Sequence, residues 1–217
     1  HQIAERSFFL AERQLPLCAR CSGMYLGTWV GLIYLFSKGR AGGLPIRSAL
    51  IPLAALAVLF VVDGVNSYLT LFNPHPILYV PQNWLRMLTG SGLGIGIAAF
   101  LVPTFNLTVW LDVQLEPIMK SWKPIFGLLA AALLANLGML SNNPLLVYTL
   151  ALLSSVTVMI LLTLAYTLVW VLLTHRENTF RDWKQASWHI LAGFGAALLQ
   201  IGLIDFVRYT LTGSWAG

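Results

Sequence analysis

Charged residues are scarce in this sequence: they make up 10% of its 217 residues, whereas hydrophobic residues make up 58%. A soluble domain carries about 25% charged residues, so the shortage excludes an ordinary water-soluble protein. Strict alternation of polar and apolar residues is also missing, which excludes the strands of a membrane β-barrel. Together with a mean hydropathy of +0.76, these absences predict an all-α, polytopic integral membrane protein.

Apolar runs near the ~20 residues that an α-helix needs to cross a bilayer occur six times. We expect transmembrane helices at about residues 22–37, 48–72, 84–104, 124–140, 145–174 and 188–209. The fifth run is unusually long, so its helix should tilt or protrude. No internal repeat or linker interrupts the sequence, which predicts a single transmembrane helical domain over residues 1–217, with residues 1–21 as an external, interfacial Cys-His segment.

Basic residues in the connecting segments predict the orientation, because lysine and arginine are retained on the cytoplasmic side. One side carries eight: Lys38, Arg40, Arg47, Lys120, Lys123, Arg176, Arg181 and Lys184. The other side carries five: Arg6, Arg13, Arg20, Arg86 and Arg208. We therefore expect the first group in the cytoplasm, and the N-terminus outside.

Cysteine is almost absent: Cys18 and Cys21 are the two in the chain, and they form a Cys-x-x-Cys motif ahead of the first apolar run. Two cysteines at this spacing can share a zinc or iron ion, and His1 in the same segment is the candidate third ligand. Alternatively, Arg20 and the start of the first helix would favour a reactive thiolate for thiol-disulfide exchange. A structural disulfide, or two inert thiols, is the third interpretation, and the motif leaves all three open.

A second polar cluster lies within the apolar runs. Asp63 and Asn66 share one face of the second helix, and ionisable groups at this depth are costly and usually paired or functional. Arg86, at the start of the third helix, is the predicted partner of Asp63. The pair is either a buried clasp between helices or, with Asn66, the catalytic lining of an outward-facing polar cavity beneath the cysteines.

The sequence lacks the motifs of several other classes of protein. No basic run or aromatic-basic module indicates nucleic-acid binding, and Ser22 follows Cys21 where a c-type haem motif has histidine. The glycines spaced by four residues follow no strand, so they predict close helix contact in place of phosphate binding. These are Gly23, Gly27 and Gly31 in the first helix, and Gly90 and Gly94 in the third.

Two blocks of the sequence resemble a known family. Residues 1–25, with His1-Gln2, Arg6-Ser7-Phe8-Phe9 and Pro16-Leu17-Cys18-Ala19-Arg20-Cys21-Ser22-Gly23-Met24-Tyr25, are similar to the opening signature of the DUF2085 membrane proteins of bacteria and archaea. Asp63-Gly64 and Asn83-Trp84-Leu85-Arg86 with Thr89-Gly90 resemble its second block. The resemblance implies a cysteine immediately before the histidine, and hence a Cys-His plus Cys-x-x-Cys ligand set, but it implies no reaction.

Three functions remain open at this point. The first is a membrane protein with an external zinc or iron centre at His1, Cys18 and Cys21, above the cavity of Asp63, Asn66 and Arg86. The second is a membrane thiol-disulfide oxidoreductase. The third is an accessory subunit of a larger, energy-transducing membrane complex, which binds its partners through glycine-rich helix faces. In each case we expect lipid contact, in the cytoplasmic membrane of a prokaryote.

Overall fold

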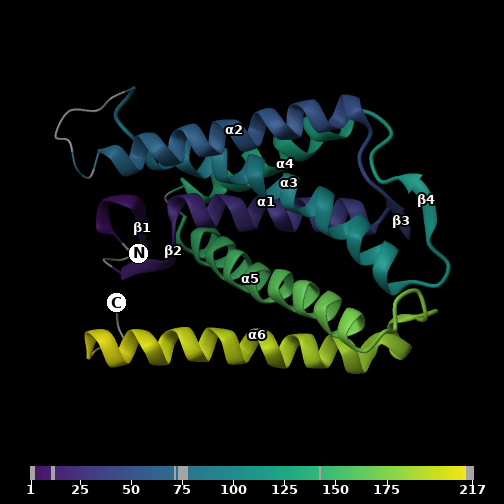
Figure 1. Ribbon diagram of the computed structural model, residues 1–217. Coiled ribbons are helices and arrows are strands. Elements are labelled where there is room, and N and C mark those ends of the chain that lie inside the picture. Colours follow the sequence, from purple (N-terminus) through teal and green to yellow (C-terminus); the bar gives the residue numbers. More distant parts are fainter. Residues whose placement is uncertain (1–2, 11–12, 71, 73–77, 142, 214–217) are drawn as a thin grey trace.

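Helices dominate the computed structural model, which describes residues 3–10, 13–70, 72, 78–141 and 143–213 (Figure 1). The described residues form six helices: α1 (Ala19–Phe36), α2 (Arg47–Leu69), α3 (Asn83–Val109), α4 (Lys123–Met139), α5 (Pro144–Leu173) and α6 (Trp183–Thr212). Four of them, α2, α3, α5 and α6, are long and apolar enough to cross a membrane, while α4 is a shorter apolar helix. The predicted all-α, polytopic membrane fold is confirmed; six helices form where six spans were predicted, and four of these qualify as membrane spans by length and composition.

Successive helices run in alternating directions, so the bundle has two ends (Figure 1). One end, which we name the cysteine end, holds the chain termini and the starts of α1, α3 and α5. The opposite end holds the connections from α1 to α2, α3 to α4 and α5 to α6. There the Arg40 side chain donates to the carbonyl of Arg181 at 2.6 Å, which joins two of the predicted cytoplasmic loops.

Helices α1 and α3 form the centre of the bundle, because glycine lets their backbones touch. A Cβ atom at Gly27 would overlap the carbonyl of Ser91, and one at Gly94 would overlap the carbonyl of Met24. The hydroxyl of Ser91 also donates to the carbonyl of Gly23 at 3.1 Å. Small residues at such positions allow close helix packing in a membrane. The predicted helix contact is confirmed, since these glycines face the other helix of the same chain.

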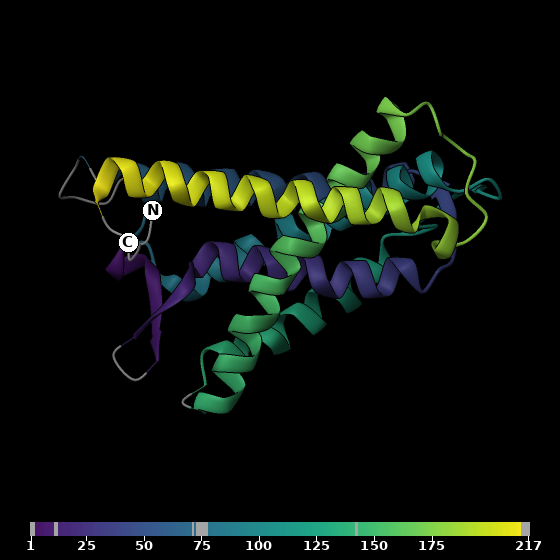
Figure 2. The ribbon, with the colours of Figure 1, turned by 90° about the horizontal axis from the view of Figure 1, so that it is seen from below.

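Helix α5 contains 30 residues and crosses the bundle at an angle (Figure 2), as its length predicted. Its start packs near the cysteine end, and its far end leads into α6. Helix α6 packs mainly on α5, and 11% of its apolar window is buried in the protein. The exposed leucines of α6 therefore match a lipid environment and not water.

Short strands are the part of the fold that the sequence analysis missed. A 3-10 turn, η1 (Ala4–Arg6), precedes a hairpin of β1 (Ser7–Leu10) and β2 (Arg13–Cys18), within the segment predicted to lie at the interface. At the other end, β3 (Ala41–Gly43) pairs in parallel with β4 (Gln114–Pro117). These strands are too short to show a two-residue period, and β3 and β4 meet because α1 and α3 end side by side.

The α1–α3 contact generates a test of the fold. We expect Gly94→Ala to lower the stability of the protein by about 1–3 kcal/mol, because its methyl group has no space against Met24. The matched control is Gly127→Ala in α4, where nothing lies within 4 Å of the added Cβ. Thermal unfolding in detergent measures both variants, and equal midpoints would contradict the packing.

Candidate functional site

The Cys-x-x-Cys motif lies where strand becomes helix. Cys18 is the last residue of β2 and the N-cap of α1, with extended φ and ψ of −66° and 159°, and Cys21 lies in the first helical turn. Both are free cysteines with partly exposed side chains. The strand-to-helix junction thus presents two thiols, three residues apart, at the surface of the cysteine end.

Cys18 is the more acidic thiol. Its pKa falls from an ordinary value of 9.0 to about 6, chiefly because the side chain of Cys21 donates a hydrogen bond to it. Burial opposes the shift, while the backbone N–H groups of Cys21 and Arg20 and the charge of Arg20 reinforce it. Unpaired N–H groups at a helix start favour an anion in this way. The junction therefore favours the thiolate at Cys18, whereas the hydrogen bond to Cys18 and burial raise the pKa of Cys21.

The ligand set predicted for a metal is not assembled by the described residues. Within residues 3–10, 13–70, 72, 78–141 and 143–213, no three side chains of His, Cys, Asp or Glu form a group that could hold a metal ion. His1, the predicted third ligand, lies outside the described residues, as does His75 in the α2–α3 connection. The structure brings Cys18 and Cys21 together and leaves the role of His1 a prediction.

Asp63 is paired with Arg20, and the predicted pairing with Arg86 is wrong. The Arg20 Nε atom lies 3.1 Å from Oδ2 of Asp63, its Nη2 atom forms a salt bridge with the same oxygen, and Nη2 also donates to the Asp63 carbonyl at 3.1 Å. Asp63 is 1% exposed. The difference has a geometric cause: Arg20 reaches Asp63 of α2 from the first turn of α1, whereas Arg86 donates to Ser67 and Asn83.

Tyr79, which the sequence analysis missed, holds the other oxygen of Asp63. Its hydroxyl donates to Oδ1 at 2.8 Å, and burial, followed by this hydrogen bond to a carboxylate, raises the pKa of Tyr79 to about 12. Asn66 fixes the backbone around Tyr79, because its Nδ2 donates to the Tyr79 carbonyl at 3.0 Å and its Oδ1 accepts from the N–H of Leu78 at 3.2 Å. Asn66 thus positions Tyr79 over Asp63.

Arg86 belongs to a cluster of three arginines around Ser67. Its Nε donates to Oγ of Ser67 at 3.2 Å and its Nη1 to Oδ1 of Asn83 at 2.9 Å. Arg20 donates to the same Oγ at 3.1 Å, and Arg6 donates to the Ser67 carbonyl at 2.6 Å. Arg6 and Ser67 were not predicted, since Arg6 precedes the helices and Ser67 carries no charge to single it out.

The arginine cluster adds positive charge beneath the thiolate. Three guanidinium groups, those of Arg6, Arg20 and Arg86, share this network with one carboxylate, that of Asp63. Cys18 interacts electrostatically with Arg86 as well as with Arg20. An anion at Cys18 therefore offsets part of the positive charge, and the polar network and the dithiol form one electrostatic unit.

The predicted outward-facing cavity is replaced by a closed network. Asp63 and Asn66 are each 1% exposed and Arg86 is 6% exposed, whereas an open cavity would expose them. Asp205, near the end of α6, forms a local ion pair with Arg208 at 3.5 Å.

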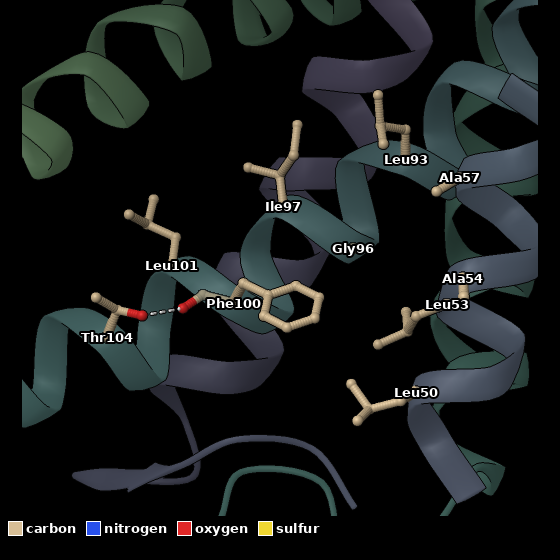
Figure 3. A pocket seen from close by; sticks show the side chains of 10 residues that line it. All are labelled: Leu50, Leu53, Ala54, Ala57, Leu93, Gly96, Ile97, Phe100, Leu101 and Thr104. Carbon is tan, nitrogen blue, oxygen red and sulfur yellow. Dashed lines mark hydrogen bonds between the residues drawn. The ribbon is translucent and has the colours of Figure 1, made fainter. Parts of the chain in front are cut away.

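A large groove of about 640 Å³ between α2 and α3 lies instead toward the opposite end (Figure 3). Leu50, Gly96 and Phe100 line it with other apolar side chains. The hydroxyl of Thr104 at its edge is bonded to the carbonyl of Phe100 at 2.7 Å. This groove is suited to lipid chains and offers little polar chemistry.

Removing Arg20 should destabilise the protein strongly. We expect Arg20→Met to cost about 3 kcal/mol, because it leaves the enclosed carboxylate of Asp63 without its cation. Arg208→Met is the matched control, since its ion pair with Asp205 is partly exposed and should contribute less than about 1 kcal/mol. Denaturant unfolding in mixed micelles measures both, and a similar loss in the two variants would refute the importance of the buried pair.

The acidity of Cys18 predicts the pH dependence of alkylation. The thiolate is the reactive form, so the rate at Cys18 should rise with pH and reach half its maximum near pH 6. Cys21→Ala removes the hydrogen-bond donor and should move the midpoint upward, toward the ordinary value of 9.0. Iodoacetamide labelling read by mass spectrometry tests this. A wild-type midpoint near 9 would contradict the hydrogen-bonded thiolate.

The part of the chain that matches known proteins contains the residues of this site. Residues 1–100, which contain both cysteines, Asp63 and Arg86, match the family described as predicted membrane protein, DUF2085. An uncharacterized protein of Methanocaldococcus jannaschii is 33% identical over 112 residues, which are 48% of this chain and 62%, just under two thirds, of that protein.

An uncharacterized protein of Methanothermobacter thermautotrophicus is 31% identical over 98 residues, which are 45% of this chain and 79% of that protein. No solved structure matches. The resemblance found in the two sequence blocks is therefore confirmed, and the chain belongs to the DUF2085 family of predicted membrane proteins.

Proposed function

We propose that this protein is a membrane thiol-disulfide oxidoreductase whose reactive group is the Cys18–Cys21 dithiol. The observation that carries the proposal is the placement of the two free, partly exposed thiols at the strand-to-helix junction. The acidic thiol at the N-cap and its neighbour in the first turn have the arrangement that dithiol exchange requires.

The chemistry follows from the two thiols. The Cys18 thiolate attacks one sulfur of a substrate disulfide, forms a mixed disulfide and releases the other substrate sulfur as a thiolate, which takes up a proton. Cys21 then loses its proton and attacks the sulfur of Cys18, which expels the second substrate sulfur. The substrate gains two electrons and two protons, and Cys18–Cys21 becomes a disulfide. The reverse sequence oxidises a substrate dithiol.

The polar network acts as the support of this dithiol. Arg20 stands between the cysteines and is bound to Asp63 and Ser67 of α2, so the first turn of α1 is fixed to its neighbour. Tyr79 and Asn66 complete the hydrogen bonds of that anchor. In this proposal Asp63, Asn66 and Arg86 are positioning residues that act through Arg20 and the local charge, and they do not touch the substrate.

The proposal also includes the side of the membrane on which the dithiol lies. The excess of basic residues at the opposite end would place that end in the cytoplasm and the cysteine end on the extracytoplasmic side of the cell membrane. Disulfides form and persist in extracytoplasmic compartments. The substrate is then a disulfide or dithiol that reaches the outer surface of the membrane.

Zinc or iron binding at the cysteines is the competing proposal. Two thiolates supply half of a four-ligand site, and His1 with a residue before it would have to fold back to complete the set. The support for exchange is the position of Cys18 at the N-cap of α1 beside Arg20, which favours a reactive thiolate. An accessory role in a larger complex is the third proposal: Gly23, Gly27 and Gly94 are used in the α1–α3 contact, whereas Gly96 of α3 and Gly195 and Gly202 of α6 have nothing within 4 Å of an added Cβ.

A trapping experiment tests the oxidoreductase. Purified full-length protein is reduced and incubated with a small aromatic disulfide, then quenched with acid and analysed by intact mass spectrometry. Wild type should yield an internal disulfide, Cys21→Ser should accumulate a stable mixed disulfide at Cys18, and Cys18→Ser should react far more slowly.

Elemental analysis of the same sample separates the two proposals. One tightly bound zinc or iron per chain, lost in Cys18→Ser, together with no mixed disulfide in Cys21→Ser, would overturn the oxidoreductase in favour of a metal centre. Metal-free protein that forms the mixed disulfide would support exchange.

A further inference from the structure

A second groove lies between the β2 strand and the start of α5. Its volume is about 610 Å³, and Leu15, Ala151 and Leu152 give it apolar walls. Arg13, Gln14 and Tyr148 also line it. This size falls within the range of cofactor and ligand sites, which typically combine apolar walls with a few polar groups. Figure 2 shows the hairpin and the first turns of α5 on the same side of the bundle.

Strand β2 contributes residues to the groove and ends at the first cysteine. Pro16 lines the groove, and Cys18 is the last residue of the same strand. A strand rises about 3.3 Å per residue, so Cys18 lies roughly 7 Å along the backbone from Pro16. A ring bound at the Pro16 end of the groove would therefore lie near the Cys18 backbone.

The chemistry of the walls selects the ligand. The apolar part lies beside Leu152 of α5, which is 48% exposed on the outside of the bundle, so an isoprenoid or alkyl tail can enter from the lipid. The guanidinium of Arg13 and the hydroxyl of Tyr148 can donate hydrogen bonds to carbonyl oxygens, and the Gln14 amide has a second N–H besides the one that it donates to Oγ of Ser7 at 2.7 Å. A hydrocarbon chain has no acceptor for these hydrogen bonds, whereas a quinone has two ring carbonyls that accept them and a lipid-soluble tail.

We infer that the groove between β2 and α5 binds a lipid-soluble quinone that accepts electrons from the Cys18–Cys21 dithiol. The inference rests on the proposed function and names the electron acceptor of the same site. In the reaction a sulfur–sulfur bond forms between Cys18 and Cys21, and the quinone is reduced to a hydroquinone. The dithiol supplies two electrons, and the two protons come from its thiols and from solvent.

The test uses full-length protein in phosphatidylcholine vesicles. The dithiol is reduced, the reductant is removed, and a fully ring-substituted decylbenzoquinone is added without oxygen, since full substitution suppresses thiol addition to the ring. Hydroquinone formation is followed by absorbance, and the Cys18–Cys21 disulfide is counted by alkylation and mass spectrometry. We expect one hydroquinone for each disulfide formed.

Two matched variants on α5 localise the reaction. Leu152→Trp fills the groove, while Leu172→Trp places the same side chain at the far end of the helix, where Leu172 is 50% exposed against 48% for Leu152. We expect Leu152→Trp to slow oxidation by quinone about tenfold, equivalent to ~1.4 kcal/mol, and Leu172→Trp to match wild type. Both variants should keep wild-type exchange with the small aromatic disulfide, which reports an intact dithiol.

The outcomes separate this inference from the proposed function. Exchange with the soluble disulfide but no oxidation by quinone, or equal quinone rates in the two tryptophan variants, would overturn the quinone site and leave the oxidoreductase standing. Loss of both reactions in wild type would overturn both. If Leu152→Trp fails to fold, Tyr148→Phe replaces it, and a selective rise in the quinone concentration needed for half-maximal rate would support the site.

Discussion

The salt bridge between Arg20 and Asp63 is the interaction on which the cysteine end depends. A carboxylate enclosed among helices of a membrane protein is strongly unfavourable unless it is paired and hydrogen-bonded. Arg20, Tyr79 and Thr89 surround both oxygens of Asp63, so the need to satisfy this one charge fixes α1, the α2–α3 connection and α3 relative to α2. Because Arg20 stands between the cysteines, the same constraint fixes the position of the dithiol.

Close packing of α1 against α3 makes that salt bridge geometrically possible. Gly23 and Gly90 lie near the cysteine end, where an added Cβ would overlap the backbone of Met87 or of Arg20 itself. Bulkier residues would push α1 away and withdraw the Arg20 side chain from Asp63. The apolar packing and the polar network are therefore interdependent, since the glycines set the separation at which the guanidinium meets its carboxylate.

The site could be predicted in part from the sequence. Intramembrane Asp63 stood out because a charge is rare and costly in an apolar run, and Cys18 and Cys21 stood out by their spacing. The partner of Asp63 could not be derived in the same way, because a helix sequence gives the faces of that helix but not the identity of its neighbours. Tyr79 and Ser67 were missed since neither residue type is unusual near a helix end, and the hairpin was missed because strands this short lack a measurable period.

By itself, the sequence determined the membrane class, the number of helices, their approximate bounds and the two polar centres. These follow from local quantities: the length of apolar runs, the rarity of charge and the spacing of cysteine and glycine. The tertiary structure alone decided that Arg20 and not Arg86 forms the salt bridge with Asp63, that Arg6 joins the cluster, and that a groove lies between β2 and α5. Each of these depends on which segments, distant along the chain, lie side by side, and the packing of whole helices sets that arrangement.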